Sequence, residues 1–303
     1  MPLRILRSSD PLRIEHIVLT IYGPPGVMKT TTLQSSRNPL TLDFDGGIHR
    51  ARYRNDAVRI NTWADVVDMK LEELSDYSTI GVDTAGRALD AMANAIMARD
   101  SKMKQGDGSL SLKGFGALKS GFTTWLNLLK TSGKDVVLIL HSDEKQSGDD
   151  LIERIDAQGS SKNEIYKSSD AMARLAVRNG KLVLLFSPTD TAFGKNPAGL
   201  PPIEVPTLQP GSTFLADIID QIKARLNEMT AEQSEVAAVL TEWNANVIAA
   251  TNADALTKLV KKADGVDARA RETAKKALWS FAKSHGFEWK DDRFVERPVE
   301  AVA

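Results

Sequence analysis

The sequence contains no cysteine, few histidines and no long hydrophobic run, and each absence excludes a class of site or protein. Without cysteine, the 303-residue chain forms neither disulfides nor thiolate metal sites, and its four scattered histidines argue against a structural zinc site. No segment approaches the roughly 20 consecutive apolar residues of a membrane helix, and residues 1–16 lack the apolar run of a signal peptide. We therefore expect a cytoplasmic protein without a membrane partner.

An excess of charge of one sign is also absent. The chain has 39 basic and 40 acidic residues and a net charge of −1, so any binding of nucleic acid must depend on local basic patches instead of a global positive field. Its hydrophobic content of 42% is enough to bury a full core. The length suggests one large domain with an appendage, or two domains.

Short β-branched runs alternate with longer amphipathic segments through the first two thirds of the chain. This order predicts an α/β domain with a largely parallel sheet. The Asn179-Gly180 dipeptide within 171–188 favours a type I′ turn, so we expect the sheet to end in an antiparallel hairpin. The expected strands are 14–22, 39–45, 57–61, 78–83 and 135–141, and the expected helices are 30–35, 62–74, 86–100 and 116–132.

The last third of the chain has a different texture. After a loop rich in proline and glycine at 194–206, apolar residues recur at helical spacing. We place a domain boundary near Thr230, which gives a core at 1–229 and a helical C-terminal region at 230–303. The last dozen residues are expected to fray. The helices expected in this part are 213–229, 231–250, 253–263 and 266–285.

The stretch IYGPPGVMKTTT, residues 21–32, carries the strongest chemical signal. A phosphate-binding loop has the pattern Gly, four residues, Gly, Lys, Ser or Thr between a strand and a helix, and its N–H groups and helix dipole bind phosphate. Gly23, Lys29 and Thr30 match this pattern. We expect Lys29 to reach the β- and γ-phosphates and the Thr30 hydroxyl to bind magnesium. The expected nucleotide-binding residues are Gly23, Pro24, Pro25, Gly26, Val27, Met28, Lys29, Thr30 and Thr31.

Met28 occupies the place of the second glycine in this pattern. If the position needs a positive φ, methionine costs on the order of 1–2 kcal/mol. If it has helical dihedrals in the first turn of the helix, its N–H still donates to phosphate and only the side chain needs room. The second conformation is favoured here, with weaker or slower handling of the nucleotide as the expected consequence.

Three carboxylates follow apolar strands. STIGVDTAG ends a strand at Asp83, which suits the carboxylate that orients the magnesium shell from the strand beside the phosphate loop; an acidic strand end also serves turns. TLDFDGG offers Asp43 and Asp45, which the pleat places on one face. Either can orient or deprotonate the attacking water, and spacing does not choose between them.

His141 ends the apolar run DVVLIL. A polar residue at the carboxyl end of a strand lies in the crevice where open α/β sheets bind ligands. It can therefore sense the γ-phosphate and pass the signal to the loop that follows. A histidine that merely ends a strand is the alternative.

The order of these motifs resembles a known family. The chain reads IYGPPGVMKTTT, LDFDGGIHRAR, TIGVDTAGRALD, DVVLILHSDEK and FSPTDTAFGKNPAG. It resembles the RecA-like ATPases of bacteriophages that promote single-strand annealing, over roughly residues 14–206. The resemblance implies a RecA-like P-loop core that binds ATP and Mg²⁺, hydrolyses ATP with stimulation by DNA, and assembles on single-stranded DNA as a ring or filament of identical subunits. A single-strand DNA-binding protein is a further candidate partner, and a phage-encoded chain would act in the host cytoplasm.

The resemblance also assigns roles by position. Lys29 and Thr30 match the phosphate-loop pair, Asp83 the aspartate that orients the metal, and His141 the sensor at a strand end. Asp45 falls where RecA-like enzymes have the glutamate that activates water, although aspartate is shorter by one methylene. Lys195 in AFGKN resembles a lysine that enters the ATP site of the neighbouring subunit, and the alternative is a solvated loop lysine.

The expected DNA-binding residues lie in three segments. IHRARYR interleaves cations with Tyr53, the combination that single-strand binding uses. The segments 101–116 and 144–164 have the composition of mobile loops, and in RecA-like proteins such loops line the DNA channel. Solvated surface lysines are the alternative there. The candidates are Arg50, Arg52, Arg54, Lys102, Lys104, Lys113, Lys145 and Lys162.

Three other functions remain open from the sequence. The first is a nucleotide-gated binding or adaptor module in which Met28 has removed hydrolysis. The second and third are a P-loop kinase and an AAA+ remodelling ATPase, but a lid for an acceptor substrate and an arginine-finger segment are not evident. The C-terminal region is either a helical cap on the core or a contact for DNA or a partner.

Overall fold

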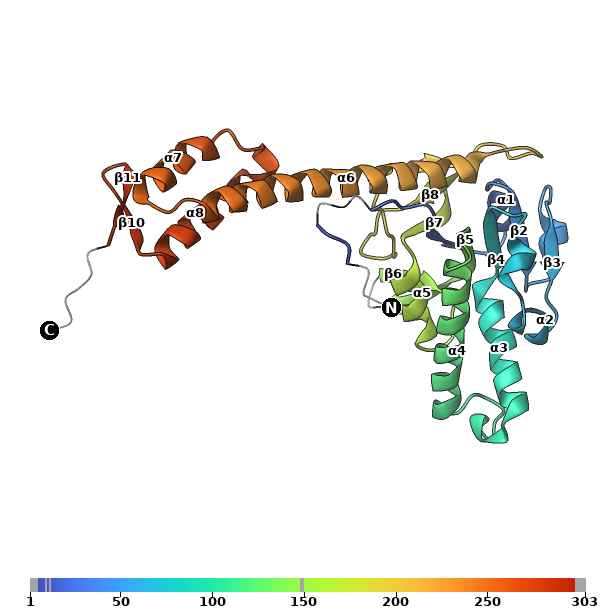
Figure 1. The fold of residues 1–303 in the computed structure, drawn as a ribbon. Helices are drawn as coiled ribbons and strands as arrows, with labels where there is room; N and C mark the ends of the chain where they lie inside the picture. The colour runs from blue at the N-terminus through green and yellow to red at the C-terminus, as the bar shows by residue number, and fades with distance from the viewer. Residues whose placement is uncertain (1–4, 9, 11, 148–149, 298–303) are drawn as a thin grey trace. The chain divides into compact units, whose positions relative to one another are not determined.

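The computed structural model describes residues 5–297 except 9, 11 and 148–149, and Figure 1 shows the fold. The chain divides into two compact units, Ile14–Leu226 and a second one that combines Met1–Arg13 with Asn227–Ala303. In the described part of the chain, every helix is too short or too polar to span a bilayer. The predicted domain boundary near Thr230 lies inside a continuous helix, α6 (Phe214–Ile248), so the two separate helices expected there are one.

The larger unit contains a sheet in the order β3-β2-β4-β5-β1-β7-β8-β9. All pairs from β3 to β7 are parallel, whereas β8 and β9 are added antiparallel and β6 pairs with the far end of β5. The predicted α/β class with a mostly parallel sheet, a terminal hairpin and a helical extension is therefore confirmed. The strands are β1 (Val18–Gly23), β2 (Pro39–Asp43), β3 (Ala57–Arg59), β4 (Thr79–Asp83), β5 (Asp135–Ser147), β6 (Asp150–Ile155), β7 (Ala171–Arg178), β8 (Lys181–Leu185) and β9 (Ile203–Glu204).

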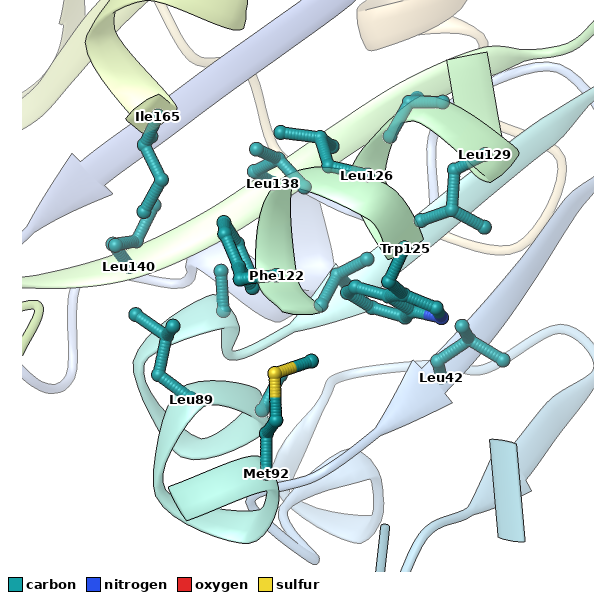
Figure 2. Close-up of a cluster of buried hydrophobic side chains, with 14 of the residues drawn as sticks. Leu42, Leu89, Met92, Phe122, Trp125, Leu126, Leu129, Leu138, Leu140 and Ile165 are labelled. Carbon is teal, nitrogen blue, oxygen red and sulfur yellow. The ribbon is translucent and has the colours of Figure 1, made fainter. Parts of the chain in front are cut away.

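Both faces of the central strands are buried, which explains why their sequences are almost continuously apolar. Val18 and Tyr22 of β1 point into one hydrophobic cluster, while Leu19 and Ile21 point into the other, as the period of two requires. The first cluster is covered by α3 (Ala85–Arg99) and α4 (Leu112–Lys130), and Figure 2 shows Phe122 and Trp125 of α4 packed against Leu89 and Met92 of α3. The second is covered by the first turns of α6.

Several predicted boundaries differ from the structure, and β1 begins at Val18 where a strand was expected from residue 14. The helix expected at 62–74 is split into α2 (Ala64–Val67) and a 3-10 helix at Leu71–Leu74. The helix expected at 116–132 begins four residues earlier because the Ser111 side chain accepts a hydrogen bond from the Gly114 N–H and caps it. The expected strand 135–141 continues to Ser147.

The two segments expected to be mobile loops are built into regular structure. Residues 101–116 form a 3-10 helix, a bridge between Lys104 and Leu110, and the start of α4. Residues 144–164 form the β5–β6 hairpin and the start of α5 (Ser161–Ser168), apart from 148–149, which lie outside the described residues. The hairpin continues past the residues at which β5 pairs with β1 and β4, and its sequence is largely polar, so it resembles a loop.

The smaller unit has its own core. Besides the second half of α6 it contains α7 (Ala253–Ala263), α8 (Ala268–Ser284) and a hairpin of β10 (Phe287–Lys290) and β11 (Arg293–Glu296). Trp243 lies in this core and donates from Nε1 to the Ala274 carbonyl at 2.8 Å. The hairpin corrects the prediction of helix and frayed end in this part. Its turn residues Asp291 and Asp292 both have positive φ, without the glycine that signals such turns; residues 298–303 lie outside the described part.

Candidate active site

The predicted phosphate loop joins β1 to α1 (Lys29–Leu33), at the carboxyl edge of the parallel strands. Gly23 is required by packing, because a Cβ there would lie 2.3 Å from the Leu175 carbonyl oxygen of β7. Gly26 has a φ of +82°, which glycine adopts without strain. The strand, the turn and the helix therefore occur in the order that a phosphate site needs.

Met28 has left-handed backbone dihedrals, φ 57° and ψ 30°. The expectation of helical dihedrals at this position is wrong. The residue lies at the N-cap of α1, where the chain turns sharply out of the loop before the helix starts, and this turn needs the conformation that a glycine adopts freely. A methionine here costs on the order of 1–2 kcal/mol of conformational energy, so the surrounding fold holds a strained residue at the base of the loop.

Lys29 is buried, with 6% of its surface exposed. Its Nζ donates to the carbonyl oxygens of Gly23 at 2.9 Å and Pro24 at 2.8 Å, and lies 3.4 Å from His141 Nδ1. Burial lowers the pKa of Lys29 to about 8, against the opposing charges of Asp83 and Asp45. The ammonium group is thus held in the loop by carbonyls, where a phosphate oxygen can replace them.

The side chains of Thr30 and Asp83, the two predicted metal ligands, are in direct contact. The Thr30 hydroxyl donates to Asp83 Oδ2 at 2.6 Å. Burial, together with the charges of Asp43 and Asp45, raises the pKa of Asp83 to about 6, although the bond from Thr30 and the charge of Lys29 oppose the shift. A hydroxyl and a carboxylate are hard oxygen donors that suit Mg²⁺, which keeps several waters and takes few protein ligands. Among the described residues, no group of three or more acidic, histidine or cysteine side chains is arranged to hold a metal.

Asp83 does not lie on the strand beside the phosphate loop, contrary to the prediction. β5 lies between β1 and β4, so Asp83 is two strands away from Gly23. The inserted strand places His141 directly opposite Gly23 in the parallel register. Burial, followed by the charge of Lys29, lowers the pKa of His141 and favours its neutral form. His141 is therefore placed at the phosphate loop, beside the Lys29 ammonium.

The structure separates the two aspartates that spacing left equivalent. β2 ends at Asp43, which is buried and accepts hydrogen bonds from the N–H groups of Gly47 and Ile48. Asp43 therefore stabilises the turn. Asp45 lies beyond the strand end, borders the pocket and forms ion pairs with Arg50 and Arg87. Of the two, only Asp45 has a carboxylate placed toward the site.

These groups surround a pocket of about 450 Å³, within the size range of small-molecule sites. Arg50 and Arg52 lie at its rim, so two predicted DNA-binding residues belong to the phosphate-loop region. The residues that line the pocket are Pro25, Gly26, Met28, Lys29, Thr30, Thr31, Asp45, Gly47, Arg50, Ala51, Arg52, Asp83, Thr84 and His141. Gly23, Pro24 and Val27 belong to the same loop but are not among them.

Lys195 lies elsewhere in its own subunit. Its Nζ donates to the Ser169 carbonyl at 2.7 Å, and its backbone bridges Met172 of β7. The same segment is anchored by Tyr22, whose hydroxyl donates to the Phe193 carbonyl at 2.6 Å. Lys195 is not among the residues that line the phosphate-loop pocket, so any role in ATP chemistry concerns the pocket of another subunit.

The other predicted DNA-binding residues are not brought into one group. Arg54 is exposed, whereas Tyr53 packs against the second hydrophobic cluster and is not free to stack on a base, which corrects that part of the prediction. Three of the lysines, Lys102, Lys104 and Lys113, are exposed near the far end of the α3–α4 pair, about 22 Å along α3 from its first residue. Of the other two, Lys145 is 3.6 Å from Asp143 on the β5–β6 hairpin, and Lys162 lies in α5.

Arg87 is the site residue that the sequence reasoning missed. It lies in the first turn of α3, four residues after Asp83, and reaches Asp45 and Asp90. A second, smaller pocket of about 80 Å³ adjoins it and shares Thr84 and His141 with the first. The sequence signal was available in DTAGR, where an arginine in the first turn of a helix follows a strand-end aspartate.

Comparison with known proteins supplies the family. A family model described as an AAA domain matches residues 15–198, well over half of the chain. The crystal structure of the RadB recombinase aligns at 15% identity over 56% of this chain and 79% of that one, with a TM-score of 0.31. A KaiC-like protein from the hyperthermophilic archaeon Pyrococcus horikoshii OT3 aligns at 11% identity over 60% and 86%, with a TM-score of 0.32. Neither alignment is close enough to support an argument, and no curated protein matches the chain.

Proposed function

Because this chain belongs to the AAA domain family of P-loop ATPases, we propose that it binds Mg-ATP in the phosphate-loop pocket, hydrolyses it and acts on single-stranded DNA in recombination or annealing. The convergence of four residues from one helix and two strands carries the ATPase part of the proposal: Lys29 and Thr30 of α1, Asp83 of β4 and His141 of β5. The DNA part depends on the order of motifs, which resembles that of the phage annealing ATPases.

Each polar group in the pocket has a task in this proposal. Lys29 binds the β- and γ-phosphates with the N–H groups of the loop. Thr30 and Asp83 hold Mg²⁺, which neutralises phosphate charge. Asp45 accepts a proton from, or orients, the attacking water. His141 contacts the γ-phosphate and relays its presence to the β5–β6 hairpin that follows it.

The proposed assembly is a ring or filament of identical subunits on single-stranded DNA, in the cytoplasm of a host cell if the chain is phage-encoded. Arg50, Arg52 and Arg54, with the exposed lysines named above, supply cations for the phosphate backbone. Lys195 enters the ATP pocket of the neighbouring subunit. The division into an ATPase core at 1–229 and a C-terminal region at 230–303 is part of the proposal, and a single-strand DNA-binding protein is a candidate partner.

Two observations favour a second function, a nucleotide-gated DNA-binding module with little hydrolysis. Met28 keeps a strained left-handed conformation in the loop. Both carboxylate oxygens of Asp45 already face guanidinium groups, Oδ2 that of Arg50 and Oδ1 that of Arg87, so they are less available to a water molecule. Turnover separates the two functions, because the module binds ATP without hydrolysing it.

Magnesium-dependent ATP hydrolysis, with and without single-stranded DNA, tests the proposal. We expect turnover that DNA stimulates and that Lys29→Ala abolishes. Lys130→Ala, at the exposed end of α4, serves as the matched lysine control and should behave like the wild type. Binding of ATP without turnover under every DNA condition would support the gated module instead, and absence of nucleotide binding would contradict both.

A further inference from the structure

We infer that Arg87 pairs with the carboxylate of Asp45 when the pocket is empty and binds the γ-phosphate when ATP is present. The inference rests on the proposed function and adds to it a residue that distinguishes ATP from ADP. It follows from the placement of two guanidinium groups around a single carboxylate at the edge of the phosphate pocket.

The two arginines contact different oxygens of Asp45. Arg50 donates from Nη2 to Oδ2, and Arg87 Nε lies 3.7 Å from Oδ1. Arg87 also donates from Nη1 to Asp90 Oδ2 at 3.1 Å. Asp45 is itself mostly buried, with 22% of its side chain exposed, whereas the side chain of Arg87 is 59% exposed. The carboxylate is thus largely enclosed, whereas the guanidinium lies at the surface with its two acidic partners.

The backbone of Arg87 is fixed beside the magnesium-binding pair. Its N–H donates to the Thr84 hydroxyl, which caps α3 directly after Asp83. Gly86 lies so close to the Asp156 carbonyl that a Cβ would be 2.9 Å from that oxygen, so the helix start is packed tightly against the segment after β6. A long side chain on a rigid base can reach either of two nearby anions.

The two pockets place this guanidinium next to the position of the terminal phosphate. The pocket of about 80 Å³ is lined by Arg87, His141 and Thr84, and the last two also line the phosphate-loop pocket. A nucleotide held by Lys29 and Thr30 directs its γ-phosphate toward His141, and therefore toward Arg87.

Charge decides the exchange. The γ-phosphate of ATP carries more negative charge than a carboxylate and offers three acceptor oxygens to the planar fork of an arginine. It therefore competes with Asp45 for Arg87, and ADP does not. When Arg87 moves to the γ-phosphate, Oδ1 of Asp45 becomes available to the water beside that phosphate.

The test compares the affinities of ADP and of a non-hydrolysable ATP analogue, both with magnesium, by calorimetry. In Arg87→Ala we expect the analogue to lose affinity about tenfold or more, as for a lost charge-assisted hydrogen bond, while ADP affinity changes less than about twofold. Arg87→Lys should lose less. Arg99→Ala, in the last turn of the same helix, is the matched control and should resemble the wild type.

A second variant keeps the inference testable even if Arg87→Ala fails to fold. Asp45→Asn frees Arg87 for the phosphate, so it should raise the affinity for the analogue and lower kcat, and a purely structural role for Asp45 predicts no such gain. Equal changes for ADP and analogue, or no change in either variant, would overturn the inference. If the wild-type chain binds neither nucleotide, the proposed function fails instead.

Discussion

At the scale of single residues, the phosphate loop combines a well-formed lysine site with one residue in an unfavourable conformation. Gly23 and Gly26 fill positions that only glycine fits, because of a close carbonyl in one case and a positive φ in the other. Met28 occupies a third such position without being glycine. The sequence favoured helical dihedrals for Met28, but the structure has the strained left-handed form.

Met28→Gly should raise the free energy of unfolding by about 1 kcal/mol, since the left-handed strain disappears and only part of the gain is lost to the flexibility of glycine. Urea unfolding measures this. Val27→Gly is the control, because Val27 is not among the positive-φ residues and its loss of side-chain packing should destabilise the chain. If methionine also slows turnover, Met28→Gly should hydrolyse ATP faster; an unchanged stability would show that the loop relaxes around the methionine.

The affinity for ATP should fall as the pH rises above the pKa of Lys29. The pKa of Lys29 is lowered to about 8, so its ammonium is charged below that pH and neutral above it. Binding of ATP measured without magnesium should therefore weaken above pH 8, by up to about tenfold per pH unit. Lys29→Arg keeps its charge to much higher pH and should lose this alkaline limb. An affinity that stays flat to pH 9.5 in the wild type would contradict the prediction.

At the scale of elements, the cap of α4 determines where the helix that covers the first hydrophobic cluster begins. Ser111→Ala removes the side chain that accepts from Gly114, so we expect a loss of about 1 kcal/mol in the free energy of unfolding. Ser111→Asp should retain most of the stability. Ser120→Ala, on the exposed side of the same helix, should have little effect in the same urea titration. Equal stability of all three would show that the cap does not matter.

The sequence predicted the elements whose residue pattern is set by burial. It did not predict sheet order, the polar hairpin or the turn without glycine, because burial does not determine these. Buried strands read as β-branched runs, so β1, β2, β4 and β5 were found, and Lys29, Thr30 and Asp83 followed from their places at strand ends. Spacing along the chain does not encode sheet order, so the insertion of β5 between β1 and β4 was missed. The β10–β11 turn has positive φ at two aspartates and no glycine, and the polar composition of 144–164 conceals the β5–β6 hairpin. The DTAGR motif places Arg87 in the first turn of a helix, but only the fold shows that it reaches Asp45.

At the scale of the whole molecule, the position of Lys195 predicts a division of labour between subunits. If its ammonium acts in a neighbouring pocket, Lys195→Ala and Lys29→Ala should each be inactive alone. Mixing equal amounts should restore up to about a quarter of the wild-type ATPase rate. In a random assembly, one of the four possible neighbour pairs forms a shared site that contains both lysines. The rate is measured against each variant mixed with wild type, and a mixture that stays inactive would place Lys195 outside the chemistry.

Tyr22 connects the phosphate loop to the segment that contains Lys195. Its backbone leads directly into the phosphate loop, while its hydroxyl holds the carbonyl of Phe193, two residues before Lys195. The segment that contains Lys195 is therefore tied to the residue that precedes the chain's own phosphate loop. If Lys195 acts in a neighbouring pocket, moving its segment outward would break the bond from Tyr22 and so free a side chain of the strand that leads into the chain's own phosphate loop.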